Sequence, residues 1–452
     1  MSETAGDPHG SGRRMTLDEA KRYVLDAARA RGIAAEVLGS RARELTARSH
    51  QQRIEQITQA VQGGIGVRVV VDGRMGYGYS EELSTAALDW MLNEAIDNAH
   101  LQTETDKFLP DGTDVGRHDL VGDGLAAPLE SKVRTALGFE GTLREDKRVK
   151  QVMFASYTER EGDVTLGSTQ GAEGAYRRGV AGVMASVVMQ EGESLKQSWD
   201  ADWVRDIRTL DPAHTALDFT QRTGRLLGAR PLQTGRYTAY FEPKAFAQLL
   251  AAFWPMWSGR SVREGKSRLA GKRGERIASS LVTLIDDPLL ADGLATRPFD
   301  AEGEPGRPLT LVDDGVLTNF FTNSETARAL ALPNTGHAAR HYRGVVDISP
   351  SNFYVKPGAG IRMDTGVIVA EISGVHAGTN SISGDFSVQA LGLWAENGEV
   401  VYPVENFAVA GDFLTLLMNI SAVDAALKWE FMGRMAVGTP TIAVTDLSFA
   451  GV

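Results

Sequence analysis

Hydrophobic positions in the first hundred residues repeat with two different periods, and each period predicts a different kind of element. Thr16 and Glu19 have the T-x-x-E spacing of a capping box, and apolar residues then recur every three or four positions. The stretch GIGVRVVVDGRMGYGYS is typical of two strands joined at Asp72-Gly73, a dipeptide that favours a tight hairpin. A second helical repeat follows Ser84. We therefore expect an α+β unit with an antiparallel sheet.

The middle of the chain combines a polar connection with further strands and helices. Residues 103–128 are rich in Asp, Gly and Pro, which is typical of a surface connection. The pattern then predicts helices over 129–144 and 213–227, and strands over 149–157, 164–168 and 176–189. Gly228 stands where a glycine often ends a helix, so we place a domain boundary just beyond it.

Beyond this boundary the pattern becomes more strand-like, with short helices between the strands. Residues 234–241 alternate as a strand, and Pro243 is well suited to the first position of a helix. We predict a two-domain α+β protein whose first domain is a sandwich-like unit of helices and sheet and whose second is mainly antiparallel β. The predicted division is 1–15 as a disordered N-terminus, 16–229 as the N-terminal domain and 230–452 as the C-terminal domain.

Composition supports two domains and disfavours polyanionic partners. A chain of 452 residues is too long for one ordinary core, and its 49 glycines indicate many turns and hairpins. The net charge of -11 argues against nucleic acid and anionic membranes, because phosphate binding relies on clustered Lys and Arg. One segment, 260–276, holds seven basic and two acidic residues. Aromatic residues do not interleave these charges, so we interpret it as a solvated loop.

The chain contains no cysteine, which excludes disulfides, thiol catalysis and cysteine-based metal sites, and fits a reducing cytoplasm. Its first residues are polar and glycine-rich, without the apolar core of a signal peptide. The longest apolar runs are much shorter than the roughly 20 residues that span a bilayer. We therefore expect a cytoplasmic protein without a membrane partner.

Motifs for familiar chemistry are absent, although two loops resemble sites. The sequence has no H-E-x-x-H, no phosphate-binding glycine loop and no G-x-S-x-G elbow. His337 and His341 are four residues apart, but a turn-rich segment precedes them and no carboxylate follows His337, so we favour a structural or substrate-lining role. The stretch GVHAGTNSISGD places His376, Ser383 and Asp385 in one small-residue loop. A serine nucleophile there would need His376 as its base.

Three stretches in the right order resemble the TldD/PmbA family. The first is GIGVRVVVDGRMGYGYSEELSTAAL, residues 64–88, similar to the hairpin and helix of that family's first domain. The second is DPLLADGLATRPFDAEGEPGRPLTLVDDGVLTNFFTNSETARALALPNTGHAAR, residues 287–340. The third runs from SGDFS to the end of LGLWAENGEVVYPVENFAVAGDFLTLLMNISAV, residues 383–423. The resemblance covers nearly the whole chain from Thr16 onward.

Within this family the chain resembles the TldE (PmbA) branch. TldD-type chains carry an H-E-x-x-x-H zinc motif and a cysteine before the S-G-D-F segment, whereas TldE-type chains lack both. The corresponding segments here, FEPKAFAQLLAAF at 241–253 and EISGVHAGTN at 371–380, contain neither the motif nor a cysteine.

The resemblance implies a subunit of a zinc metallopeptidase complex that acts in proteolysis or peptide maturation. Its partner would be a TldD-type chain that holds the zinc, and this chain would have no cofactor and no catalytic or metal-binding residue of its own. A homodimer is open for the chain alone. The substrate would be a peptide or unfolded polypeptide, held in a cavity that these residues help to form: His337, Arg340, His376, Ser383, Gly384 and Asp385.

Two other functions stay open. One is an autonomous, metal-independent hydrolase with a Ser/His/Asp arrangement that the linear sequence does not reveal, and the missing motifs count against it. The other is a regulatory binding protein, which the older family label of gyrase modulator suggests. The negative charge counts against direct DNA binding.

Overall fold

The computed structural model describes residues 15–452, so the predicted disordered N-terminus lies outside the described residues apart from Met15. Helices and strands are mixed along the whole described chain, which confirms the α+β class. One sheet lies within residues 34–204, and all other sheets lie within residues 230–450.

The N-terminal sheet has seven strands, six of which follow the order β3-β2-β1-β5-β6-β4. The seventh strand, β7, lies on the same side of β6 as β4 but pairs with a different stretch of β6. All its pairings are antiparallel except that between β4 and β6. Asp72 and Gly73 take positive φ values of 50° and 73°, as the predicted hairpin between β2 and β3 requires. The strands are β1 Ala34–His50, β2 Arg53–Val71, β3 Arg74–Ser80, β4 Asp114–Leu120, β5 Val149–Ser168, β6 Glu173–Glu191 and β7 Ser194–Val204.

Two sequence predictions for this sheet were wrong in detail. The two strands expected over 149–157 and 164–168 are one strand, β5, because the polar residues between them stay in the ladder with β1 and β6. The expected surface connection over 103–128 contains the strand β4. Its pairing partner β6 follows β4 only after the helix α3, Leu129–Glu145, and the strand β5, so the local pattern carried no sign of it.

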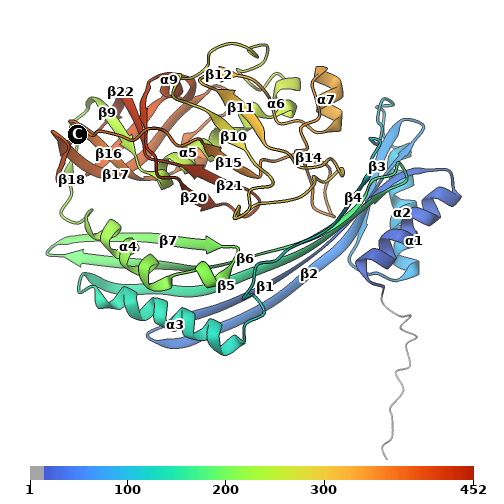
Figure 1. Ribbon diagram of the computed structural model, residues 1–452, viewed down its shortest axis with the longest axis horizontal. Coiled ribbons are helices and arrows are strands. Elements are labelled where there is room, and N and C mark those ends of the chain that lie inside the picture. Colours follow the sequence, from blue (N-terminus) through green and yellow to red (C-terminus); the bar gives the residue numbers. More distant parts are fainter. Residues whose placement is uncertain (1–14) are drawn as a thin grey trace, which may run out of the picture.

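Four α-helices cover this sheet in two pairs, at its two ends (Figure 1). The first helix begins at the predicted capping box, with Thr16 and Glu19 bonded reciprocally. The second pair packs Phe139 and Phe219 onto β5 and β6. The helices are α1 Leu17–Ala30, α2 Thr85–His100, α3 Leu129–Glu145 and α4 Pro212–Gly224, with a 3-10 turn η1 at Ile207–Thr209.

The C-terminal part contains a seven-stranded sheet, a six-stranded sheet and a two-stranded pair. Their orders are β19-β22-β9-β16-β17-β18-β8, β12-β11-β10-β15-β21-β20 and β13-β14. Most pairings are antiparallel as predicted, but β9–β16, β8–β18 and β15–β21 are parallel. The strands are β8 Arg230–Pro231, β9 Gly235–Phe241, β10 Leu284–Asp286, β11 Leu309–Asp313, β12 Val316–Leu317, β13 Ala338–Ala339, β14 Asp347–Ile348, β15 Asn352–Val355, β16 Gly366–Ser373, β17 Asp385–Glu396, β18 Glu399–Asp412, β19 Ile420–Val423, β20 Lys428–Phe431, β21 Ala436–Thr439 and β22 Ile442–Ala450.

Short helices fill the space around these sheets and complete one large core. Phe253 at the end of α5 stacks on Phe413 at the start of α9, with ring centroids 4.3 Å apart. The helices are α5 Pro243–Phe253, α6 Gly259–Arg263, α7 Ser324–Leu330, α8 Val375–Gly378 and α9 Phe413–Met418, with a 3-10 turn η2 at Trp254–Trp257.

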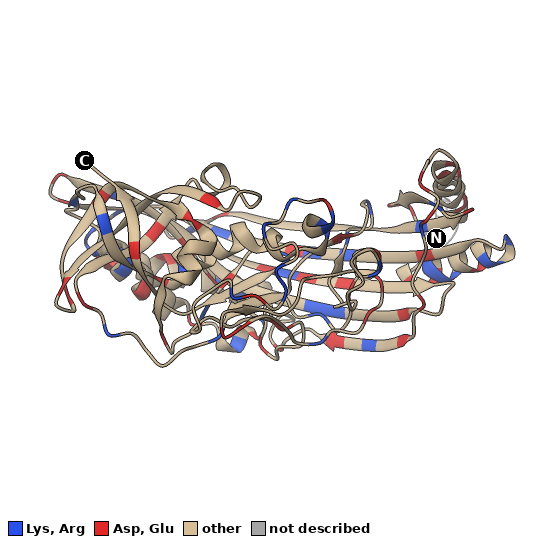
Figure 2. Ribbon diagram, turned by 90° about the horizontal axis from the view of Figure 1, so that it is seen from above, with Lys and Arg blue, Asp and Glu red and all other residues tan. Residues whose placement is uncertain are grey.

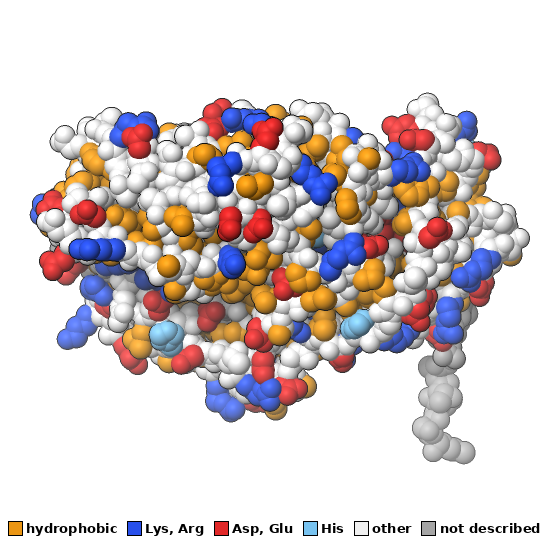
Figure 3. Space-filling view, turned by 45° about the horizontal axis from the view of Figure 1, so that its top comes forward, with side chains coloured by type: hydrophobic (Ala, Val, Ile, Leu, Met, Phe, Trp, Pro, Cys, Tyr) orange, Lys and Arg blue, Asp and Glu red, His pale blue; other side chains and the backbone are white. Residues whose placement is uncertain are grey.

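The long N-terminal sheet is curved, and the C-terminal part sits over its concave side, opposite α3 (Figure 1). A small apolar cluster joins them: Leu38 and Leu166 of the sheet pack against Phe299 and Tyr342. Charged residues of both signs are scattered along the strands and over the surface, without a broad patch of one sign in these views (Figures 2 and 3). Among residues 15–452, no helix is both long enough and apolar enough to cross a membrane.

Candidate functional site

His337 lies in the interior of the C-terminal part and not in an open cavity. Its side chain is fully buried, and its Nε2 lies 3.0 Å from Oδ2 of Asp286, at the end of β10. Its Nδ1 lies 2.9 Å from the hydroxyl of Thr335. Burial lowers the pKa of the imidazole more than its hydrogen bond to the Asp286 carboxylate raises it, so the pKa of His337 lies below its ordinary value. Burial also raises the pKa of Asp286, but hydrogen bonds from His337 and Ser351 outweigh this and hold it below its ordinary range.

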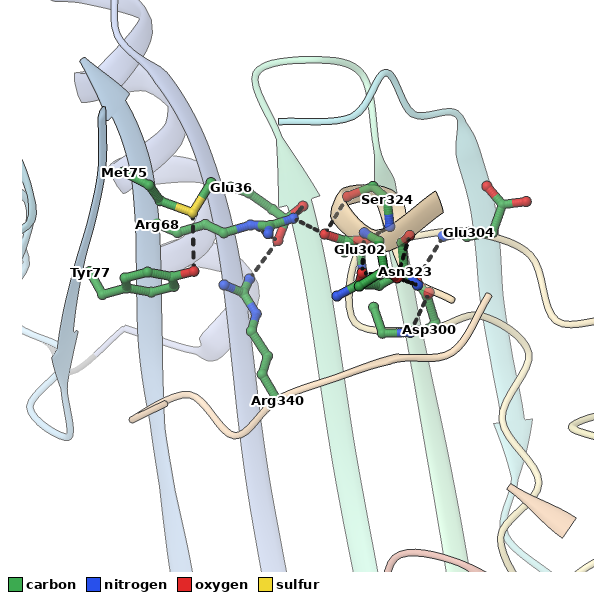
Figure 4. A network of polar contacts seen from close by, with 12 residues as sticks. Glu36, Arg68, Met75, Tyr77, Asp300, Glu302, Glu304, Asn323, Ser324 and Arg340 are labelled. Carbon is green, nitrogen blue, oxygen red and sulfur yellow. Dashed lines mark hydrogen bonds and ion pairs between the residues drawn. The ribbon is translucent and has the colours of Figure 1, made fainter. Parts of the chain in front are cut away.

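Arg340 is also buried, in a network of charged groups between the two parts of the chain (Figure 4). Its Nη2 lies 2.8 Å from Oε1 of Glu36 on β1, and its side chain is only 2% exposed. Arg68 on β2 binds the same carboxylate with two hydrogen bonds of 2.9 Å and reaches Oε1 of Glu302 at 2.9 Å. Two arginines and two glutamates therefore balance one another at a place where each side chain is at most 3% exposed.

The network continues into the loop that carries Glu302. Its carboxylate accepts hydrogen bonds from the backbone N–H and the hydroxyl of Ser324, at 2.8 and 2.7 Å. Asp300 accepts backbone hydrogen bonds from Glu302, Glu304 and Ala338. Burial and the neighbouring Glu302 nevertheless raise the pKa of Asp300 to about 7. The network thus avoids adding a third full negative charge near neutral pH.

Burial corrects the prediction that His337 and Arg340 contact a substrate. Neither side chain reaches the surface, so a peptide cannot touch them in this conformation. The physical reason is that each is bound by a carboxylate far away in sequence, 51 residues for His337 and more than 300 for Arg340. The side-chain contacts that the structure shows for both residues lie inside the protein.

Two adjoining cavities lie beside this network, with volumes of about 450 and 300 Å³. Arg68 and Glu302 line the larger one, and Lys107, Arg263 and Glu325 line both. Lys107 and Arg263 each bind Glu325, at 2.7 and 2.8 Å. Lys107 and Arg263 are therefore already paired, whereas Arg328, which also lines the larger cavity, donates to the carbonyl oxygen of Asp106 and lies over the ring of Phe108.

The predicted loop at 374–385 forms a separate site on the seven-stranded C-terminal sheet. Gly384 has a φ of +87°, and an added Cβ would lie 2.7 Å from Nη1 of Arg268 and 2.8 Å from Oδ2 of Asp412. Arg268 binds both Asp412 and the carbonyl oxygen of Ser383. Only glycine suits this position, because it needs both a left-handed backbone and the space that the ion pair occupies.

His376, Ser383 and Asp385 share this loop but do not form a catalytic arrangement. Within residues 15–452, no hydrogen bond joins His376 to either of the other two, and the Ser383 hydroxyl accepts only the backbone N–H of Asp385, at 3.3 Å. His376 on α8 and Asp385 at the start of β17 are exposed. Without a base beside it, Ser383 is not an activated nucleophile.

The loop does present a polar surface. Asp385, Ser387 and Gln389 alternate along β17 and are exposed, while the residues between them are buried. None of these three side chains forms a hydrogen bond within the described part of the chain. The helix α8, which carries His376, packs beside them, since an added Cβ on Gly378 would lie 2.2 Å from the Ser387 carbonyl oxygen. This polar surface is therefore available to a binding partner.

A third cavity, of about 1200 Å³, lies on the N-terminal sheet. The first turn of α1, five strands and the segment around Tyr342 line it. Most of its charges are paired: Arg177 binds Asp119 and Asp163, and Arg117 binds Asp18 at 2.7 Å.

Comparison with known proteins places the chain in a family. Models of the PmbA/TldA metallopeptidase family match in three parts: domain 1 over residues 35–99, the central domain over 122–227 and the C-terminal domain over 234–451. The chain belongs to the PmbA/TldD family. Its relatives place it in the TldE (PmbA) branch, as the sequence predicted. The family models divide residues 35–227 into two domains, whereas the pattern alone suggested one.

Individual PmbA/TldD relatives resemble the chain over nearly its full length. Metalloprotease PmbA of Escherichia coli O157:H7 is 27% identical over 97% of each chain. A homologue of PmbA from Haemophilus influenzae is 24% identical over 96% of each. A solved Thermotoga maritima structure, described as a proposed modulator of a DNA gyrase, has a TM-score of 0.88 and 26% identity, covering 96% of this chain and all of that one. TldE from Thermococcus kodakarensis shares the fold, with a TM-score of 0.81, 22% identity and coverage of 96% and 99%.

The helix α5 is mostly apolar. In α5 the polar side chains are Lys244 and Gln248, and neither is a usual zinc ligand. The inward face is Phe246, Leu249, Leu250 and Phe253, all fully buried. Within residues 15–452, no cluster of His, Asp and Glu is arranged to hold a metal ion.

Sequence reasoning missed Glu36, Arg68 and Glu302, which form the charged network between the two parts of the chain. Their partners are 32 and 234 residues away in sequence, so neither motif nor periodicity could join them. One signal was available in the sequence. Glu36 and Arg68 are charged residues inside strand stretches whose other residues are mainly Val, Leu, Ile and Gly. A charge inside an apolar strand indicates a buried partner.

Proposed function

We propose that this chain is the zinc-free subunit of a TldD/TldE-type metallopeptidase and that it helps to hold the peptide. Membership of the PmbA/TldD family, whose relatives are named metalloproteases, supports the general class. The single observation that carries the specific role is the chemistry of α5. It packs Phe246, Leu249 and Phe253 into the core where a zinc subunit would present its ligands.

Cleavage in this proposal belongs to a TldD-type partner in the cytoplasm, and this chain contributes binding. The exposed polar side chains of β17 and the neighbouring His376 form a polar surface, and within the described residues these side chains make no hydrogen bonds to one another. An extended peptide bound there would find donors and acceptors at alternate positions. Substrates would be peptides or unfolded polypeptides, because an extended strand is needed for such contacts.

The other two functions find less support. An autonomous serine hydrolase would need His376 beside Ser383, and within the described residues no hydrogen bond joins their side chains. A regulator that binds DNA directly would need a basic surface, but the cations of the segment 260–276 are largely paired, as Arg263 with Glu325 and Arg268 with Asp412 show.

Reconstitution tests the proposal. This chain alone should cleave no peptide, a TldD-type subunit alone should be weak, and the mixture should be active and inhibited by a chelator. Asp385→Ala or His376→Ala in this chain should lower the mixture's activity about tenfold, since loss of positioning reduces rate without removing the chemistry. The zinc content of the partner should not change.

Glu399→Ala serves as the matched control, because Glu399 is an exposed acid at the opposite end of β17 and β18. It should leave activity unchanged. Chelator-resistant cleavage by this chain alone would overturn the proposal in favour of the hydrolase. A mixture no more active than the TldD-type subunit alone would also overturn it.

A further inference from the structure

The two adjoining cavities beside the charged network, the junction cavities, lie where the two parts of the chain meet. The strand β3 and residues 102–108 line them from the N-terminal part, and α6, α7 and residues 345–347 line them from the C-terminal part. Their volumes, about 450 and 300 Å³, are within the range of small-molecule sites, which occur preferentially between domains. The polar groups that the protein leaves unused in these cavities indicate what kind of molecule fits.

Asn323 brings an amide donor without a protein acceptor to both cavities. The residue is only 5% exposed, and its Oδ1 accepts the backbone N–H and the hydroxyl of Thr326, at 3.0 and 2.7 Å, as the N-cap of α7. Because only the oxygen can accept from a backbone N–H, these bonds fix Nδ2 on the other side of the amide. Among residues 15–452, nothing accepts a hydrogen bond from this Nδ2. A buried donor of this kind needs an acceptor from outside the chain.

Tyr77 on β3 offers a second donor, from the other part of the chain. Its hydroxyl lies 3.0 Å from Sδ of Met75, and a thioether sulfur is only a weak acceptor. Both residues line both cavities. Figure 4 shows Tyr77 on one side of Arg340 and Asn323 on the other. A ligand with a stronger acceptor can therefore take the Tyr77 hydroxyl away from the sulfur.

Arg328 on α7 supplies a positive charge to the larger cavity. Its guanidinium lies 3.7 Å from the ring centroid of Phe108, and its Nη2 donates to the carbonyl oxygen of Asp106. Within the described part of the chain no carboxylate binds Arg328, whereas Lys107 and Arg263 are both paired. The planar fork of a guanidinium matches a carboxylate, and stacking on an aromatic ring holds that plane in place. Arg328 is therefore the cation that a ligand carboxylate would find free.

The rest of the lining restricts the remainder of the ligand. The unused groups are donors, so the ligand must bring acceptors. Asp106 is exposed at the rim of the larger cavity and favours an ammonium group over a second carboxylate. Apolar side chains come from both parts of the chain and favour a short hydrocarbon group: Met75, Phe108, Ala329, Val345 and Val346.

We propose that the junction cavities bind a small carboxylate with an apolar side chain, of the size of an amino acid or a dipeptide. Arg328 binds the carboxylate, and the amide of Asn323 and the hydroxyl of Tyr77 donate to the acceptors of the ligand. Since these groups come from both parts of the chain, binding stabilises their observed placement. The inference does not depend on the proposed peptidase role, because none of these residues belongs to the polar surface on β17.

Isothermal titration calorimetry of the full chain with three probes tests the class of ligand. L-leucine and the dipeptide alanyl-leucine should bind saturably, with one molecule per chain, and the tighter of the two shows whether a free amino acid or a peptide end is preferred. Leucinamide keeps the ammonium group and the side chain but lacks the carboxylate. It should bind at least about tenfold more weakly, because a hydrogen bond to a charged group contributes about that much to affinity. Equal binding of leucinamide, or no saturable binding of either carboxylate, would overturn the proposal.

Substitutions locate the bound L-leucine. Arg328→Gln should raise its Kd about tenfold or more, and Tyr77→Phe and Asn323→Ser should each raise it about threefold to tenfold, since each removes one neutral donor. Serine still caps α7, so the helix keeps its N-terminal hydrogen bond. Arg273→Gln is the matched control and should leave the Kd unchanged. Arg273 is also an exposed arginine that donates to a backbone carbonyl, that of Thr318, and binds no carboxylate among residues 15–452.

Two results with these variants would contradict the assigned place. The first is a natural Kd in both Arg328→Gln and Tyr77→Phe, with circular dichroism showing that the two are folded. These side chains lie outside the fully buried core, so the pair decides the matter even where Asn323→Ser fails to fold. The second is loss of L-leucine binding in Asp385→Ala but not in Arg328→Gln, which would move the ligand to the polar surface on β17.

Discussion

Individual charged residues in this protein are held at positions where burial changes their protonation. Glu430 on β20 is half-buried, near Lys244, Asp200 and Arg222. Lys244 and Arg222 already bind Asp200, so neither cation is free for Glu430. Burial raises the pKa of Glu430 to about 7, because the favourable charge of Lys244 offsets only part of the desolvation.

Glu430→Gln should therefore remove a pH-dependent loss of stability. The carboxyl has an ordinary pKa of 4.5 and a folded value of about 7. The folded state holds the proton of Glu430 more tightly than the unfolded state does. The contribution of Glu430 to the free energy of unfolding is therefore most favourable below pH 4.5 and falls as the pH rises towards 7. Such a shift corresponds to at most about 3 kcal/mol, and partial exposure reduces it to roughly 1 kcal/mol.

Urea unfolding between pH 4.5 and 8 checks this expectation for Glu430. The variant should match the natural chain at the acid end and exceed it at the alkaline end. Glu399→Gln, at an exposed position, should give the natural profile. A variant that is less stable at pH 8 would show that Glu430 works as a bound carboxylate.

Single residues could be predicted from the sequence where their partners are local. Thr16 and Glu19 form their capping box three residues apart, and Asp72-Gly73 forms its turn without outside help. His337 could be recognised as notable but not explained, because its partner Asp286 comes from a distant strand. The role of such a residue depends on tertiary contacts, which periodicity does not encode.

Among the elements, the loop between α8 and β17 shows how a glycine fixes local geometry. Gly384 donates its N–H to the carbonyl of Asn380 and accepts from the N–H of Phe413, both at 2.8 Å. Arg268 and Asp412 form an ion pair beside Gly384. The loop therefore holds the start of β17, with Asp385, against α9.

Gly384→Ala should destabilise the protein more than Gly374→Ala in the same loop. Both glycines have positive φ, of +87° and +72°, so both substitutions carry a backbone cost of about 1 kcal/mol. Only Gly384 also has Arg268 and Asp412 within 3 Å of the added Cβ. Its total cost should be about 2 to 3 kcal/mol in equilibrium unfolding. Equal costs would mean that the ion pair moves aside freely.

Elements with a clear period were predictable, and those defined by pairing were not. The helices after Thr16, Ser84 and Pro243 follow from caps and amphipathic spacing. The strand β4 was missed, since its sequence is polar and it exists because β6 lies beside it. The polar surface on β17 was predicted only as a loop. The alternation of polar and apolar residues shows that one face of the strand is polar, but it does not show what that face contacts.

At the scale of the whole molecule, the curved N-terminal sheet and the C-terminal part are joined by a buried charge network and a small apolar cluster. Glu36 and Arg68 come from the sheet, and Glu302 and Arg340 come from the other part. Hydrogen bonds at the opposite end, such as that from Ser198 to Glu371 at 2.7 Å, hold the two parts there. Burying charge between the two parts makes their relative placement specific, because any shift would separate charges that are largely withdrawn from solvent.

Arg68→Met should therefore loosen the two parts from each other. It leaves Glu36 and Glu302 buried with only Arg340 to balance them, and breaking a buried pair by removing one partner costs about 3 to 5 kcal/mol. Loosening of the two parts should expose the segment that connects them, so limited proteolysis near residues 228–234 should speed up before the sheets themselves melt. Arg177→Met is the matched control. Arg177 binds three carboxylates, one more than Arg68, but is 49% exposed, so its loss should cost less than about 1 kcal/mol. Equal effects of the two substitutions, in melting temperature and cleavage rate, would show that the apolar cluster around Leu38 and Phe299 is sufficient to join the two parts.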